Sequence, residues 1–301
     1  MGTITIVSFA LFFVSCIALE PPSEDDLAGI QVPPLQNEPK FYTRASFKHK
    51  YVNNAGVIRD TKSTGYWVTI SATTNCQATA LEKAALIVSR MVKHMPADVF
   101  NGLSKSHGVG IFSAKEGLTV YPEFSNLRDT ADCHHKCSGS CAHTCTFDGR
   151  KYETLGGLTS SISCVVDDNV ICDSADKNHH HQNTLVHEFG HLVMHYMPSH
   201  LRSQIVAAYN HAKQSNLWNN HQYAMATNGE YWAEATAAFF MSTVRTDVTG
   251  GMNLCGGHHA CSSDLLSRHY LGKHDPTLYK ILEYVYTDNK PDIPGDLKPC
   301  V

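Results

Sequence analysis

Two histidines and a glutamate near the middle of the chain have the types and spacing needed to hold a metal ion and activate water. The stretch "NTLVHEFGHLVMHYM" (183–197) carries His187, Glu188 and His191 on what reads as one helix. Residues four apart lie on one helix face, about 6 Å apart along the axis, so both imidazoles can reach one ion. Glu188 follows the first of them and can turn toward a water on that ion to take its proton.

Such a site needs a third protein ligand, because catalytic zinc is held by three protein ligands and keeps its fourth position for water. His195 continues the row but lies about 12 Å from His187 along the axis, too far to share an ion, so we expect it to be structural. The pattern HExxHxxGxxH fails, because Met194 stands in place of the glycine and Met197 in place of the last histidine. No aspartate-supplying motif of the aspzincin kind follows.

A pair of glutamates further along the chain supplies the remaining candidates. In "NGEYWAEATAAFF" (228–240), Glu230 and Glu234 fall on one face of a predicted helix. One carboxylate can bind zinc while the other fixes a ligating histidine from behind.

The combination of "HEFGH" with "EYWAEA" resembles the gluzincin metallopeptidases, and most closely the catalytic domain of anthrax lethal factor and related exported metallopeptidases. The resemblance covers about residues 183–240. It implies one catalytic Zn²⁺ with Glu230 as third ligand and Glu234 as the carboxylate behind the ligands. It also implies that Tyr223, seven residues before Glu230, helps to stabilise the transition state as a donor to the oxyanion.

The sequence therefore predicts a secreted zinc-dependent metalloendopeptidase that hydrolyses peptide bonds in a protein or peptide substrate, with Glu188 as general base. One alternative is a catalytically silent, secreted zinc-binding or interaction protein with the same fold. Another is a disulfide-rich matrix protein whose surface histidines bind metals. We expect "HHH" (179–181) to be an exposed flank of the helix.

The N-terminus indicates export. Residues 1–18 have the short, uncharged apolar run of a signal peptide, and residues 19–40 have the acidic, proline-rich composition of a linker or pro-segment. The formal net charge is −4 and the basic residues are scattered along the sequence, so the sequence shows no basic patch for binding nucleic acid. After signal cleavage, no segment is long and apolar enough to cross a membrane.

Cysteine usage agrees with an oxidising compartment. Of eleven cysteines, Cys16 would leave with the signal peptide, and the ten that remain could form up to five disulfides. Short loops favour Cys164 with Cys172 and Cys255 with Cys261. The cluster "CHHKCSGSCAHTC" (133–145) could be a second zinc site, but it lacks the paired CxxC spacing of zinc modules, so we expect a disulfide-tied loop.

Hydrophobic periodicity predicts an α+β fold over residues 41–301, a zincin-like two-lobed metallopeptidase domain with a mixed N-terminal lobe and a mainly helical C-terminal lobe. The 183–197 helix would lie at the junction. The stretch at 160–166 reads as an edge strand, either one that pairs with extended substrate or an ordinary edge of the sheet. The other predicted elements are strands at 65–74 and within 108–124, and helices at 78–95, 200–213, 230–243 and 275–288.

Overall fold

The computed structural model describes residues 46–146, 149–290 and 292–300. These residues all fall within one compact unit. The predicted signal peptide (1–18), Cys16 and the acidic segment (19–40) lie outside the described residues.

A mixed sheet forms the first half of the described chain. Its strand order is β2-β1-β3-β4-β6-β5. The two central pairs, β3 with β4 and β4 with β6, are parallel, whereas β1 and β5 run antiparallel to their neighbours. The strands are β1 (Phe47–Val52), β2 (Ile58–Arg59), β3 (Val68–Thr73), β4 (Gly108–Phe112), β5 (Gly157–Thr159) and β6 (Ile162–Val166).

Alternating side chains give the sheet two apolar faces. In β6, Val165 packs into the main core with α2 (Ala80–Val92) and α5 (Thr184–Tyr196). The next side chain, Cys164, points to the other face and packs with the 3₁₀ helices that cover it, Leu118–Val120 and Pro122–Leu127. Strand β6 is therefore buried on both sides, as a central strand requires.

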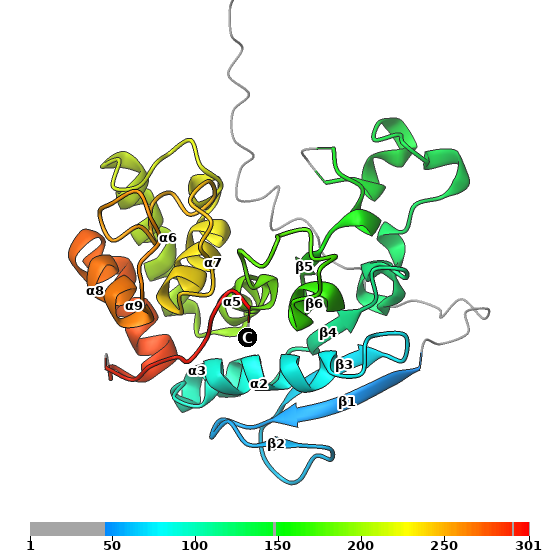
Figure 1. Cartoon of the computed structure of the whole chain (residues 1–301), viewed down its shortest axis with the longest axis horizontal. Helices are drawn as coiled ribbons and strands as arrows, with labels where there is room; N and C mark the ends of the chain where they lie inside the picture. Colours follow the sequence, from blue (N-terminus) through cyan, green and yellow to red (C-terminus); the bar gives the residue numbers. More distant parts are fainter. Residues whose placement is uncertain (1–45, 147–148, 291, 301) are drawn as a thin grey trace, which may run out of the picture. The chain divides into compact units, whose positions relative to one another are not determined.

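Helices dominate the second half. Figure 1 shows α6, α7, α8 and α9 gathered on the side of α5 that faces away from the sheet. Helix α5 contacts β5, β6 and α7, so it lies between the sheet and the helical group. The fold is α+β, as predicted. The remaining helices are α3 (Ala97–Leu103), α4 (Asp167–Ile171), α6 (Ser199–Gln214), α7 (Asn228–Phe239), α8 (Asp264–His274) and α9 (Pro276–Thr287).

Some local expectations were wrong. The segment 160–166 contains an inner strand, because β6 pairs on both sides, and the edge of the sheet is β5. The second part of 108–124 is not a strand but 3₁₀ helix, since it packs across the sheet instead of joining it.

Within the described residues, no helix has the length and apolar character needed to span a membrane.

Four disulfides connect the described cysteines. The pair Cys255–Cys261 was predicted, whereas Cys172 bonds to Cys300 and not to Cys164, because β6 holds Cys164 inside the sheet. Burial raises the pKa of the unpaired Cys76 thiol to about 11 and that of Cys164 well above its usual value, so both remain protonated. The other two disulfides are Cys133–Cys141 and Cys137–Cys145.

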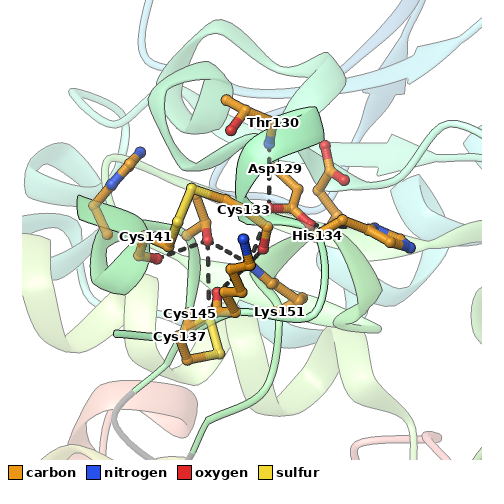
Figure 2. Close-up of polar contacts among 12 residues, drawn as sticks. Asp129, Thr130, Cys133, His134, Cys137, Cys141, Cys145 and Lys151 are labelled. Carbon is orange, nitrogen blue, oxygen red and sulfur yellow. Dashed lines mark hydrogen bonds and ion pairs between the residues drawn. A yellow bond between two sulfur atoms is a disulfide. The ribbon is translucent and has the colours of Figure 1, made fainter. Parts of the chain in front are cut away.

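The cysteine cluster at 133–145 is thus a disulfide-tied loop and not a zinc site. Figure 2 shows the Lys151 ammonium at its centre. The ammonium contacts the carboxylate of Asp129 at 2.9 Å and, at 2.7 Å each, the Thr144 hydroxyl and the carbonyls of Cys133 and Lys136. Two disulfides and one partly buried charge organise a segment that has few apolar side chains of its own.

Candidate metal centre

Two capped helices bring the predicted ligands together. The Asn183 side chain caps α5 by accepting a hydrogen bond from the backbone N–H of Val186, and Thr227 caps α7 by accepting one from Glu230. The helices pack closely where Gly190 of α5 meets α7, because a Cβ at Gly190 would already lie 3.3 Å from Thr236. This contact sets the separation of the histidines from Glu230.

Three ligand atoms form a nearly equilateral triangle. Nε2 of His187 lies 3.2 Å from Nε2 of His191, and Oε2 of Glu230 lies 3.3 Å from the first and 3.4 Å from the second. A tetrahedral zinc ion with bonds of about 2.1 Å separates its ligand atoms by about 3.4 Å. Elsewhere in the described parts of the chain, no set of three such residues is close enough to hold a metal. The residues therefore fit a zinc-sized ion.

The charges at this triangle favour a cation. Oε2 of Glu230 is buried and accepts no hydrogen bond, so it lacks the partner that a ligand would supply. Burial raises the pKa of Glu230, but His191 and His187 lower it by more, and it ends well below its ordinary value. Burial lowers the pKa of His187, but Glu234 and Glu230 raise it by more, and it ends well above its ordinary value. Between them, the two carboxylates hold a proton on His187 that a metal ion would replace.

Glu234 lies behind the triangle. Its Oε1 is 3.1 Å from Nδ1 of His187, within hydrogen-bonding distance, although the N–H is not directed at the oxygen. A carboxylate in this place favours the tautomer with the proton on Nδ1, which leaves the Nε2 lone pair free for a metal. Glu234 is 1% exposed, so its charge acts almost entirely within the protein.

Glu188 is held against the edge strand. The Thr159 hydroxyl donates to its Oε2 at 2.7 Å, and Ser163 donates to its backbone carbonyl at 2.9 Å. On the other side, a Cβ added at Gly157 would lie 2.7 Å from Oε1. Strand β5 therefore fixes the carboxylate next to His187.

Tyr223 reaches the same site from the segment before α7. Its hydroxyl donates to Oε1 of Glu230 at 2.7 Å, and its ring centre lies 6.4 Å from that of His187. Burial and then Glu230 raise the pKa of the Tyr223 phenol far above its ordinary value, so the hydroxyl keeps its proton and remains a donor. The residue as a whole is 39% exposed, so part of it is accessible to a substrate.

The sequence profile of the family described as "Anthrax toxin lethal factor, N- and C-terminal domain" matches residues 73–249, more than half of the chain. The chain belongs to the anthrax toxin lethal factor family. It is accordingly a metallopeptidase.

Two further comparisons add little to this membership of the lethal factor family. Curated proteins give no significant match. Among solved structures, the Pro-Pro endopeptidase of Paenibacillus alvei is 17% identical, covers 72% of this chain and 97% of its own, and superposes with a TM-score of 0.43.

In this lethal factor family member, the structure brings together five of the six residues selected from the sequence: His187, His191, Tyr223, Glu230 and Glu234. The sixth, Glu188, directly follows His187 on α5, and its carboxylate is held by Thr159 of β5. Other histidines are not part of the group. Nδ1 of His195 lies 3.2 Å from the Ser160 carbonyl, and in the "HHH" stretch Nε2 of His180 lies 2.7 Å from that of Asp173.

Sequence reasoning missed the residues that hold these groups in place: Gly157, Thr159, Gln182 and Arg245. Gly157 and Thr159 of β5 adjoin Glu188, Gln182 donates to Glu234, and Arg245 donates to Gln182. None of the four belongs to a recognisable motif. The spacing within one helix carries no information about them.

Proposed function

We propose that the chain is a secreted zinc-dependent metalloendopeptidase that uses Glu188 as its general base. The observation that carries this proposal is the triangle of His187, His191 and Glu230, with sides of 3.2, 3.3 and 3.4 Å. Glu188 directly follows the first of these ligands on α5. Two imidazoles and one carboxylate are the ligand set of catalytic zinc in several peptidases, and they leave one position open.

Zinc at this position would polarise the scissile carbonyl and make water acidic enough to attack near neutral pH. Glu188 would take the proton of the attacking water and pass it to the leaving amine. The Thr159 hydroxyl holds Oε2 of Glu188, so the other oxygen, Oε1, is available for this transfer. Tyr223 would turn its O–H from Glu230 to the developing oxyanion.

A peptide substrate would bind along β5. Among the described strands, β5 pairs only with β6, which leaves its outer backbone groups available to an extended chain. Strand addition at such an edge recognises main chain, with side-chain pockets adding selectivity. Because Thr159 belongs to β5 and holds Glu188, a substrate paired there would lie beside the general base.

Secretion is supported by the four disulfides, which persist in oxidising compartments, together with the signal-like sequence at 1–18. The peptide or protein substrate would then be extracellular.

The test is hydrolysis of a mixed peptide pool by the purified protein, loaded with one zinc, compared with Glu188→Gln. We expect Glu188→Gln to keep its zinc and to lose about 100- to 10,000-fold in rate, as removal of a general base does. Glu82→Gln, which removes an exposed carboxylate from α2, serves as the matched control and should retain full activity. Equal cleavage by the wild type and Glu188→Gln would refute the role of Glu188, whereas zinc binding with no cleavage by either would indicate a silent zinc-binding protein.

The third ligand has its own test. Glu230→Ala should lose bound zinc, measured as metal per protein after dialysis. Unchanged stoichiometry would reject Glu230 as a ligand.

A further inference from the structure

The start of α5 and the end of α7 are fastened to each other by backbone hydrogen bonds. Gln182 and Thr243 form an isolated antiparallel bridge. On either side of it, the Asn183 N–H donates to the Ser242 carbonyl and the Val244 N–H donates to the His181 carbonyl, both at 2.8 Å. The helix with the histidine ligands and the helix with the glutamate ligand thus share one clamp.

Side chains lie in a row from this clamp to the metal centre, with two hydrogen bonds and then one close approach to the His187 ring. Arg245 Nη1 donates to Oε1 of Gln182 at 3.2 Å, and Nε2 of Gln182 donates to Oε1 of Glu234 at 3.3 Å. The same Glu234 oxygen lies 3.1 Å from Nδ1 of His187. The orientation of the Gln182 amide is unambiguous, because a guanidinium only donates and a carboxylate only accepts.

Because the Glu234 and Gln182 side chains are buried, the hydrogen bond between them is important for the carboxylate. Glu234 is 1% and Gln182 7% exposed, so the carboxylate has lost its hydration and depends on protein partners. Gln182 supplies the donor, and through it the Arg245 guanidinium brings a positive charge toward the carboxylate. Arg245 is itself held by the Asp247 carboxylate, at 3.1 Å from Nε and 2.7 Å from Nη2.

We infer that Gln182 and Arg245 are positioning residues for the metal centre, acting in series through Glu234 on His187. They hold the Glu234 carboxylate where it orients the imidazole, so that Nε2 points at the ion. This inference rests on the proposed metal site but not on peptide hydrolysis. Neither residue contacts the ligand triangle or a substrate, so each acts only through another side chain.

The test measures the affinity of the purified full-length protein for zinc alone, by competition with a chromogenic chelator. Loss of a partner behind a metal ligand weakens binding by about 10- to 100-fold, so we expect Gln182→Met to bind zinc about tenfold more weakly. Arg245→Met should weaken binding by less, because it removes only the second link. Arg245→Lys should restore part of the loss, since an ammonium can still donate to the amide.

The double variant distinguishes a row acting in series from two independent supports. If Arg245 acts through Gln182, then Gln182→Met/Arg245→Met binds zinc no more weakly than Gln182→Met. Exposed residues of the same types, Gln204 in α6 and Arg59 in β2, provide the controls Gln204→Met and Arg59→Met, which should bind as the wild type does. The thermal transition of each metal-free variant shows whether it is folded.

Wild-type zinc affinity in folded Gln182→Met would overturn the inference, and additive losses in the double variant would overturn the serial arrangement. If Gln182→Met does not fold, the Arg245 variants decide, because the Arg245 side chain is 30% exposed and tolerates exchange. If the wild type binds one zinc but cleaves no peptide, the proposed function is refuted. The zinc affinities of the variants still test the positioning role of Gln182 and Arg245.

Discussion

Replacing Gly157 with alanine would displace the carboxylate of Glu188 without removing it. The added Cβ would lie 2.7 Å from Oε1 and 2.9 Å from Cγ of Glu188, and 2.8 Å from a methyl of Thr184. Non-bonded carbon atoms settle at about 3.5 Å or more, so Glu188 or strand β5 must move by roughly 0.7 Å. A shift of about 1 Å in a catalytic group can cost on the order of 100-fold in rate.

We therefore expect Gly157→Ala to reduce kcat by about 10- to 100-fold. Zinc affinity should not change, because the new methyl touches none of the three ligands. The cost in stability should stay below about 3 kcal/mol, since a flexible carboxylate and an edge strand can yield.

The assay is steady-state hydrolysis of a peptide selected from the mixed pool, with zinc content measured on the same samples. Gly156→Ala is the matched control, because its Cβ would meet only a methyl of Val166, at 3.8 Å. Wild-type kcat in Gly157→Ala would show that the position of Glu188 is not set by β5. An equal loss in Gly156→Ala would show that any added methyl at the start of β5 is harmful, and would refute the reasoning from contact distance.

Three other predictions follow from the site and from the disulfide-tied loop. Tyr223→Phe should retain zinc but lose about 100-fold in kcat with little change in KM, because it lacks the oxyanion donor; a change in KM alone would contradict this. In the metal-free protein, the protonated His187 side chain stabilises the fold below its unfolded pKa of about 6.5. This stabilisation is lost as pH rises through the raised pKa of the folded state. A metal ion competes with the proton for the same imidazole. The increase in Tm caused by zinc should therefore grow from pH 5 to pH 8, and a constant increase would refute the competition. Lys151→Met should speed proteolytic cleavage within 129–151 without changing zinc affinity, because four acceptors lose their donor; unchanged cleavage would contradict the role of the ammonium.

Local spacing selected the candidate ligands, and the family resemblance chose Glu230 over Glu234. His187 and His191 lie on one face because a helix repeats every 3.6 residues, and the same rule places Glu230 and Glu234 together. The α+β class followed in the same way from the periodicity of the longer segments, such as Ala80–Val92.

Pairing between distant segments was not predictable. The sequence favoured Cys164 with Cys172, but Cys172 meets Cys300, 128 residues away, because the path of the chain after α9 decides which sulfurs approach. The predicted edge strand was wrong for a related reason. Strand β6 has the composition of any buried strand, and its neighbours β4 and β5 determine that it lies inside the sheet.

By itself, the sequence placed the candidate side chains in pairs on two helix faces, because helical geometry links residues three and four positions apart, and its resemblance to a known family assigned their roles. Only the tertiary structure decided what holds those side chains in place. Thr159 reaches Glu188 across 29 residues, and Gln182 reaches Glu234 across 52. Contacts of this kind depend on how the sheet and two helices pack, and no local repeat encodes that packing.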